Sequence, residues 1–466
     1  MMNLSTLDIC LIILYILGFA LIGFICSKKV KTAKDFTAAG QNLPLKIVIG
    51  SSIATCLGAG VLFANYERIH AFGISGIIWV MGWYIGWLML VPISRQLRAS
   101  GATSLPGFLE TRFNPTTRKC ASWFVLISMI SLSASVFLAF GNACAALGIC
   151  SVKTGTIVGT IIIVIFTFVS GLWGVTVTDS IQTIIILVGC GIFMPIIAIK
   201  NVGGLGTIGE YVSSTEFLSK GIAPFTLLGY FLSNFLGAGA DASFAQRTFA
   251  SKDAKTAAIG QTIACIISCV VSLIAMIPAL TIGFFYPNIQ SGAQFTPLFV
   301  ADYFPIGLKG VMLAVLCGLL LTTGDSYLML ISSTIVDDFV RPMKKDIDDK
   351  KLIGIGRLTI AIGAVIIVIL ALYMGSIYEL IALGGSAYGA AVFFPLHLGC
   401  RTRKLSTKAV NIAIVAGGLT SFVWDLLKLS SRTGIRGVFI GVALNLIICL
   451  AGTMIVKKSE NKVEEV

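Results

Sequence analysis

The sequence predicts an all-α protein that crosses a membrane about thirteen times, and three observations support this fold class. First, 56% of the 466 residues are hydrophobic and only 12% are charged, whereas soluble domains carry about 25% charged residues. Second, the chain contains a series of apolar segments, each about as long as a membrane-spanning helix needs to be. Third, basic residues gather in every second loop between these segments, as they do in cytoplasmic loops.

Thirteen segments meet the length criterion. They lie near residues 6–26, 44–71, 74–94, 120–148, 155–172, 174–199, 222–247, 256–286, 307–339, 354–374, 377–399, 407–427 and 434–456. The first segment has no basic residue before it and four lysines after it. We therefore expect a retained span with its N-terminus outside, rather than a cleaved signal peptide.

The positive charges support the same orientation. In this topology 25 of the 34 Lys and Arg residues fall in inner stretches and seven in outer ones, a strong positive-inside bias. The chain is therefore predicted to be a multi-pass protein of the cell (plasma) membrane, in contact with lipid, with a cytoplasmic C-terminus. The net charge of +13 comes from short loops, so it does not indicate a nucleic-acid partner.

The four letters Leu-Gly-Ala-Gly occur twice inside apolar segments, at 57–60 and at 236–239. A glycine inside a helix costs roughly 1 kcal/mol relative to alanine. Paired glycine-rich interruptions in two halves of a membrane chain indicate the binding site of a transporter. The alternative is that small residues let neighbouring helices approach closely.

The two interruptions lie in the second and seventh spans, five spans apart, so their helices run in opposite directions. A repeat of five spans must be inverted in the membrane. The predicted organisation is therefore one extra span and a loop (1–43), two five-helix repeats (44–199 and 200–399), and two C-terminal spans with a short tail (400–466).

Acidic residues at membrane depth are costly and usually functional. Asp325 lies in the middle of the ninth span, and Thr322 and Ser326 share its helix face. Asp179, in the sixth span, is a second candidate. Their oxygens suit a small cation or a proton. The alternatives are hydroxyls bonded to the preceding helical turn and, for Asp179, a carboxylate favoured at a helix start.

Three other charged residues lie near the ends of spans. Glu67, Arg68 and Asp425 are expected to be interfacial anchors. The chain has only two histidines, its twelve cysteines lie mostly in apolar runs, and no nucleophile–base pair is evident. The sequence therefore predicts neither an enzyme nor an organic cofactor.

Several motifs resemble one family in their order and spacing. They are Leu-Arg-Ala-Ser-Gly-Ala-Thr-Ser-Leu-Pro-Gly-Phe-Leu-Glu-Thr-Arg-Phe (97–113), Gly171-Leu172-Trp173 with Thr178-Asp179 and Gln182, Gln246-Arg247, Thr322-Thr323-Gly324-Asp325-Ser326, and Asp337-Asp338. With these motifs the chain resembles the sodium/solute symporters, a family that includes proline, pantothenate and sialic acid carriers.

The resemblance implies the inverted five-helix-repeat fold of the bacterial leucine transporter and a Na+ site beside the first broken helix. The implied Na+ ligands are the carbonyls of Ala54, Leu57 and Leu319 and the hydroxyls of Thr322 and Thr323. It also implies a second site for a cation or proton, formed by Asp179, Thr322, Asp325 and Ser326. Asp325 stands where relatives with that site have a hydroxyl, which leaves the identity of the ion open.

The expected function is Na+-coupled symport of a small organic solute by alternating access, with Na+ as the coupling ion and a monomer as the working unit. Solute contacts are predicted at the two interruptions: Gly58, Ala59, Gly60, Asn234, Gly237 and Asp241. Asp241 attracts an ammonium group or pairs with Arg247, and the sequence leaves both open. The alternatives are a proton-coupled carrier that uses Asp179 and Asp325, and a non-transporting sensor on the same fold.

Overall fold

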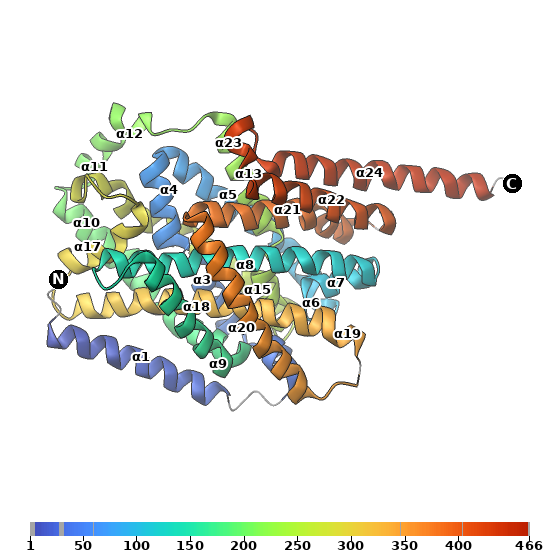
Figure 1. The fold of residues 1–466 in the computed structure, drawn as a ribbon, viewed down its shortest axis with the longest axis horizontal. Helices are drawn as coiled ribbons and strands as arrows, with labels where there is room; N and C mark the ends of the chain where they lie inside the picture. Colours follow the sequence, from blue (N-terminus) through green and yellow to red (C-terminus); the bar gives the residue numbers. More distant parts are fainter. Residues whose placement is uncertain (1–4, 28–31, 59, 345, 403, 465–466) are drawn as a thin grey trace.

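The computed structural model describes residues 5–27, 32–58, 60–344, 346–402 and 404–464, and helices make up most of them (Figure 1). Within these residues, nine helices are long and apolar enough to cross a membrane. Outside the helices, an isolated bridge joins Leu43 to Ser251.

The structure divides the chain into long helices, short helices and turns of tighter or wider helix. The longer helices are α1 (Thr6–Ser27), α3 (Leu45–Cys56), α5 (Ile74–Leu90), α8 (Pro115–Ala146), α9 (Val152–Val188), α13 (Pro224–Gly239), α15 (Ala254–Ala275), α18 (Leu308–Ser333), α20 (Asp349–Met374), α21 (Ile377–Arg401), α22 (Thr407–Leu426) and α24 (Gly437–Glu464). The shorter ones are α2 (Ala33–Ala38), α4 (Asn65–Phe72), α6 (Ser94–Ala99), α7 (Leu105–Arg112), α10 (Met194–Asn201), α11 (Leu205–Val212), α12 (Thr215–Ser219), α14 (Ala242–Ala250), α16 (Ile282–Phe285), α17 (Phe295–Tyr303), α19 (Arg341–Met343) and α23 (Leu429–Thr433). The 3-10 turns are η1 (Ala39–Gln41), η3 (Val91–Ile93), η5 (Pro278–Thr281) and η6 (Gly292–Gln294), and the π turns are η2 (Gly60–Ala64), η4 (Gly189–Phe193) and η7 (Thr334–Val340).

Both glycine-rich interruptions break their helices. The first interrupted span consists of α3, a π turn and α4, with Ala59 outside the described residues. The second consists of α13 and α14, separated by Ala240 and Asp241. Regular α-helical hydrogen bonding therefore stops within the first predicted interruption, whereas residues 236–239 still belong to α13 and the second break follows them directly at Ala240.

The predicted count of thirteen spans is not confirmed. The sequence places a boundary between the segments 155–172 and 174–199, but the structure has one helix, α9, across it. Through η4 the run continues into α10. A helix of this length rises roughly 56 Å, well beyond the ~30 Å of a hydrocarbon core. Glycines such as Gly174 are common in membrane helices and do not end this one.

The most deeply buried long helices are α8, α18 and α21. Helices α1, α8, α9 and α20 pack around α18, and α3 forms a smaller contact with it. The second broken helix, α13, packs between α5 and α21. The two breaks are thereby held in the interior, against helices that come from both halves of the chain.

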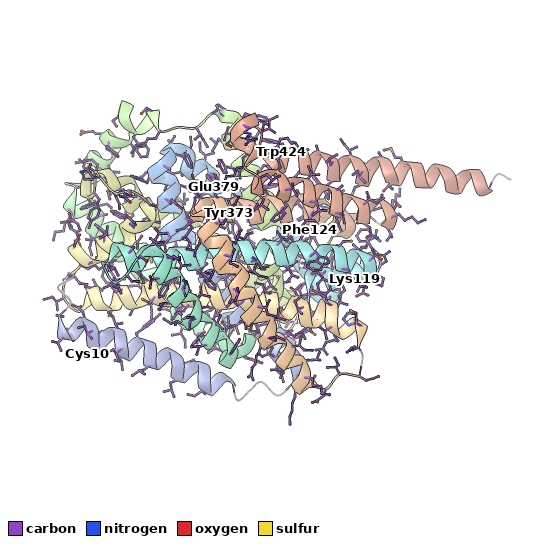
Figure 2. All side chains as sticks on the ribbon, viewed as in Figure 1. Cys10, Lys119, Phe124, Tyr373, Glu379 and Trp424 are labelled. Carbon is purple, nitrogen blue, oxygen red and sulfur yellow. The ribbon has the colours of Figure 1, made fainter. Side chains whose placement is uncertain are left out.

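The outer faces of the bundle are apolar. Leu14, Leu17 and Leu21 of α1 are exposed, as are Ile362 and Ile369 of α20. Figure 2 draws the side chains on the ribbon and labels Cys10 on α1 and Tyr373 on α20. An apolar exterior around an interior that contains the buried polar and charged groups is the arrangement that a hydrocarbon environment favours.

Figure 1 also shows how the loops are distributed between the two ends of the bundle. The short helices α10, α11, α12 and α17 lie at one end, and α6, α7 and α19 lie at the other. The N-terminus is at the first end and the C-terminal helix α24 extends beyond the second. The helices of the predicted inner loops therefore share one end of the molecule.

Candidate functional site

The first break exposes a backbone carbonyl next to a threonine hydroxyl. Helix α3 ends when the N–H of Leu57 donates to Ile53 O at 2.7 Å. In the described residues, no backbone N–H is hydrogen bonded to Ala54 O. A Cβ built on Gly58 would lie 1.9 Å from Thr323 Oγ1 and 3.3 Å from Ala54 O. These two oxygens, from α18 and α3, therefore converge on the space beside Gly58.

The hydroxyls of α18 are bonded within their own helix. Thr323 Oγ1 donates to Leu319 O at 2.8 Å, and Thr322 Oγ1 donates to Gly318 O at 3.1 Å. A hydroxyl that donates its hydrogen keeps two lone pairs, so these bonds leave both oxygens able to contact a cation. Leu57 directly precedes Gly58 in the sequence, Leu319 lies one helical turn before Thr322, and both are buried. The donor set is oxygen only, which fits a hard cation such as Na+.

A buried arginine occupies the region predicted to hold a second cation. Arg247 of α14 has no exposed surface. Its Nη2 lies 3.3 Å from Asp179 Oδ2 and donates to Ser326 Oγ at 2.9 Å. Ser51 Oγ accepts from Arg247 Nε at 3.1 Å and donates to Asp179 Oδ2 at 2.7 Å. The guanidinium thus joins α3, α9, α14 and α18.

Asp325 lies beside this cluster without a hydrogen bond. Both of its carboxylate oxygens are buried and have no hydrogen-bond partner, and the side chain has no exposed surface. It interacts electrostatically with Asp179 and with Arg247. When both carboxylates are ionised, they and the guanidinium carry a net charge of −1, which leaves one negative charge without a partner in the cluster.

The structure removes one alternative and leaves another in place. Asp179 lies well inside α9, so it is not a carboxylate at a helix start. Thr322 does bond back to the preceding turn, as the alternative for the hydroxyls supposes. Sequence reasoning missed that Arg247 belongs to this cluster. The sequence signal that could have found it is the motif Gln246-Arg247, which resembles the family.

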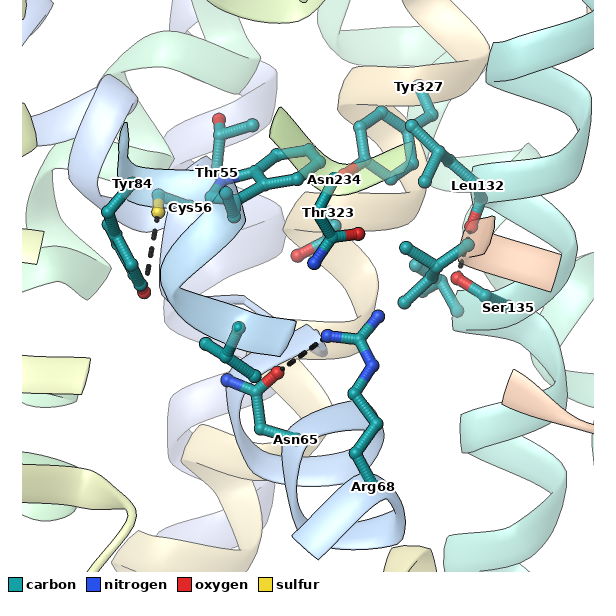
Figure 3. A pocket seen from close by; sticks show the side chains of 14 residues that line it. Thr55, Cys56, Asn65, Arg68, Tyr84, Leu132, Ser135, Asn234, Thr323 and Tyr327 are labelled. Carbon is teal, nitrogen blue, oxygen red and sulfur yellow. Dashed lines mark hydrogen bonds between the residues drawn. The ribbon is translucent and has the colours of Figure 1, made fainter. Parts of the chain in front are cut away.

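Only some of the residues predicted to contact solute lie at the central cavity. Asn234 lines a central cavity and Gly58 faces Thr323. Ala59 lies outside the described residues, and for Gly60 only the backbone is described, in η2. Figure 3 shows the cavity with Asn234 beside it.

Gly237 and Asp241 are not among the residues that line this cavity. A Cβ on Gly237 would lie 3.0 Å from the Cα of Gly385, so this glycine allows α13 and α21 to pack closely. Asp241 caps α14, where its Oδ1 accepts from the N–H groups of Ser243 and Phe244 at 2.8 and 2.9 Å. In the described residues it forms no ion pair with Arg247.

The cavity lies between the two broken helices and α5, α8, α18 and α21. It is lined by Thr55, Cys56, Asn65, Arg68, Val80, Trp83, Tyr84, Leu132, Ser135, Val136, Asn234, Thr323, Tyr327 and Ile381. Thr323 belongs both to this lining and to the convergence at Gly58. The space for a solute and the oxygens for an ion are therefore contiguous.

The prediction of interfacial anchors is wrong for two residues. Arg68 is 3% exposed and points into the cavity (Figure 3), because the break between α3 and α4 places α4 inside the bundle. Asp425 is 6% exposed, and its Oδ2 lies 3.6 Å from Nη2 of Arg436. Both charges lie inside the protein rather than at its surface.

Helices broken in two places, with a central cavity and an oxygen site beside it, define an ion-coupled secondary transporter. Residues 36–417 match the model of the sodium:solute symporter family. The chain belongs to this family, and it is a Na+-coupled transporter rather than an enzyme.

Comparisons with individual proteins agree. The chain is 24% identical to the osmoregulated proline transporter OpuE of Bacillus subtilis, over 96% of this chain and 94% of that one. It is 24% identical to the sodium/proline symporter of Escherichia coli, over 91% and 88% of the two chains.

Solved structures show the same fold. A Na+-coupled sialic acid symporter in a substrate-bound, outward-open state superposes with a TM-score of 0.79, at 18% identity and 97% coverage of both chains. A nucleobase-cation-symport-1 transporter superposes with a TM-score of 0.56, at 10% identity, over 91% of this chain and 95% of that one. The fold is that of the leucine transporter, with its inverted five-helix repeat.

Proposed function

We propose that the coupling Na+ binds where α3 ends. Its ligands are three backbone carbonyls and two hydroxyls, those of Ala54, Leu57, Leu319, Thr322 and Thr323. One observation carries this proposal: Thr323 Oγ1 converges beside Gly58 with the carbonyl of Ala54, which accepts no backbone hydrogen bond from the described residues. Oxygens from an unwound backbone and from a neighbouring helix are the kind of ligands that transporters offer to Na+.

A second coupling site is assigned to Asp179, Thr322, Asp325 and Ser326, around the guanidinium of Arg247. Arg247 supplies one positive charge to two carboxylates. Because like charges in a buried site resist ionising together, the remaining negative charge attracts one more Na+ or is removed by a proton. The second site therefore takes one cation in addition to the ion at the first break.

Coupling follows from the shared residue Thr323. With Na+ at the first break, α3 is held against α18, and the adjoining cavity is complete for a small organic solute that contacts Gly58 and Asn234. Gly60 and Ala59 belong to the same break, while Gly237 and Asp241 shape the second break and so position Asn234. Rocking of the broken helices then exposes the cavity to the cytoplasm, where low Na+ releases ion and solute.

The membrane orientation has the N-terminus outside and the C-terminus in the cytoplasm. This assignment is supported by the charge bias of the sequence and by the position of α6, α7 and α19 at one end of the bundle. The protein works in the plasma membrane as a monomer, with lipid around its apolar exterior.

The decisive experiment is uptake into proteoliposomes with Na+ and pH varied separately. We expect uptake to require a Na+ gradient, and Thr323→Ala to raise the Na+ concentration for half-maximal uptake by about tenfold or more, as loss of a metal-site group does. Thr323→Ser keeps the hydroxyl and serves as the control, with near wild-type Na+ dependence. Uptake that follows a pH gradient without Na+ would establish a proton-coupled carrier instead.

A further inference from the structure

Arg68 is a buried cation that projects into the central cavity. It lies on α4, just beyond the first break, and is 3% exposed. Its Nη1 donates to Asn65 Oδ1 at 3.0 Å, and its guanidinium carbon lies 4.6 Å from the centre of the Trp79 ring. These two contacts fix the orientation of the side chain, and Figure 3 shows the bond to Asn65.

The other buried arginines of the described residues have acidic partners. Arg247 pairs with Asp179 at 3.3 Å, and Arg436 pairs with Glu379 at 3.3 Å and with Asp425 at 3.6 Å. Arg68 forms no ion pair with a described carboxylate. The carboxylate of the adjoining Glu67 attracts Arg68 electrostatically without forming an ion pair, and it accepts the backbone N–H of Tyr378. A buried guanidinium that lacks a direct ion pair is unfavourable.

The two nitrogens of Arg68 that lack a partner are Nε and Nη2. They form one edge of the guanidinium, the edge that binds a carboxylate through two parallel hydrogen bonds. Asn65 and Trp79 contact the rest of the group and leave this edge free. The side chain is therefore preorganised for a planar anion of the size of a carboxylate.

No acid lines the cavity among the residues that the structure describes. Among its fourteen lining residues, Arg68 is the only one that is ionised at neutral pH, and none is Asp or Glu. Most of the others are apolar or aromatic, and the volume is about 60 Å³. A solute for this space is small and partly apolar and brings the missing negative charge with it.

We propose that the transported solute is a small organic carboxylate and that Arg68 binds its carboxylate group. The inference rests on the proposed solute cavity and adds the chemical class of the solute. Amino acids and simple carboxylic acids share this group. A second unpaired atom, Asn234 Oδ1, is an acceptor that an ammonium group satisfies and a simple acid leaves free.

The test is thermal unfolding of the full-length protein in detergent with Na+ present. The ligands are acetate, propionate, lactate, L-alanine and L-proline, each compared with its amide. We expect at least one carboxylate to raise the melting temperature of the wild type while its amide does not. If amino acids raise the melting temperature and simple acids do not, the ammonium group is a second determinant of binding. If simple acids raise the melting temperature, the carboxylate group is sufficient.

Variants then assign the effect to Arg68. In Arg68→Gln we expect the stabilising carboxylate to bind about 30-fold more weakly or worse, as when a buried charge pair loses one partner. Arg68→Lys retains part of the affinity because it keeps the charge but not the fork. Arg432→Gln, which removes an exposed charge, is the matched control and binds as the wild type does. Stabilisation of Arg68→Gln by Na+ alone shows that the variant is folded.

Three results would overturn the proposal: unchanged carboxylate binding by Arg68→Gln, equal stabilisation by acids and amides, or no stabilisation of the wild type by a carboxylate. A wild type that Na+ fails to stabilise, but that a carboxylate stabilises through Arg68, would instead contradict the Na+ site and leave this inference standing.

Discussion

Gly58 follows the last turn of α3 and faces Thr323 of α18. A methyl group at this position would overlap Thr323 Oγ1, since the ideal Cβ lies 1.9 Å from that oxygen. In Gly58→Ala we therefore expect α3 to be displaced from α18 and the apparent Na+ affinity of uptake to fall by at least about tenfold. The measurement is Na+-dependent uptake into proteoliposomes at a fixed concentration of solute.

Gly354→Ala is the matched control for this substitution. Gly354 lies in α20, and a Cβ there would meet no atom within 4 Å. Alanine favours a helix over glycine by about 1 kcal/mol, so this variant should fold as well as the wild type and take up solute normally. A Gly58→Ala protein with wild-type Na+ affinity would show that the ion does not bind between α3 and α18.

The sequence located the buried carboxylates better than the buried arginines. Asp325 stands in the middle of an apolar segment, and such a position can be recognised from the sequence alone. Arg68 and Arg247 stand near the ends of their apolar segments, where an arginine ordinarily reaches the interface. Their burial depends on broken helices that fold inward and, for Arg247, on a partner 68 positions earlier in the chain, Asp179. A local sequence pattern cannot predict a pair whose members lie so far apart in the chain.

At the scale of elements, the first helix supplies the cap of the central one. Asp8 of α1 has no exposed surface, and its Oδ1 accepts from the N–H groups of Gly307 and Gly310 at 2.8 and 2.9 Å. These groups lie at the N-terminus of α18, where a carboxylate is favoured by the helix dipole and by the unpaired N–H groups. The extra N-terminal span therefore fixes the start of the helix that carries Thr322 and Thr323.

Asp8→Ala should destabilise the protein without removing a ligand of the ion. Loss of a capping side chain costs about 1–2 kcal/mol, so we expect a lower melting temperature and an apparent Na+ affinity close to that of the wild type. Asp8→Asn retains an acceptor oxygen and should lose less stability. Equal melting temperatures for Asp8→Ala and the wild type would show that α18 does not depend on this cap.

Helix interruptions were predictable only where glycines occur as a repeated motif. The paired Leu-Gly-Ala-Gly segments mark both breaks, because a second copy five spans later is hard to explain by packing alone. The sequence predicts that two spans meet at Trp173, yet α9 continues through this position, with Gly171 and Gly174 inside it. A glycine weakens a helix but does not end it, so the outcome depends on tertiary contacts that the sequence does not state.

For the whole molecule, the charges inside the membrane determine how many cations a transport cycle carries. The cluster of Asp179, Asp325 and Arg247 has a net charge of −1 when both carboxylates are ionised. A cation at the second site makes it neutral. The proposed carboxylate solute gives Arg68 the ion pair that it lacks among the described residues. The loaded transporter then carries one net positive charge at these sites, that of the Na+ at the first break, because the ligands proposed for this ion are neutral oxygens.

This charge balance predicts how uptake responds to voltage. Asp325→Asn removes the excess negative charge, so we expect this variant to carry one cation fewer per cycle than the wild type. Moving one charge across 100 mV is worth about 2.3 kcal/mol, or roughly 50-fold in accumulation. Solute accumulation, measured in proteoliposomes with potassium diffusion potentials of increasing size, should therefore rise less steeply with voltage in Asp325→Asn, by one elementary charge. Asp346→Asn, at an exposed position of the predicted inner loop, should keep the wild-type slope. An unchanged slope and unchanged ion dependence in Asp325→Asn would eliminate the second coupling site, because Arg247 alone would then satisfy the cluster.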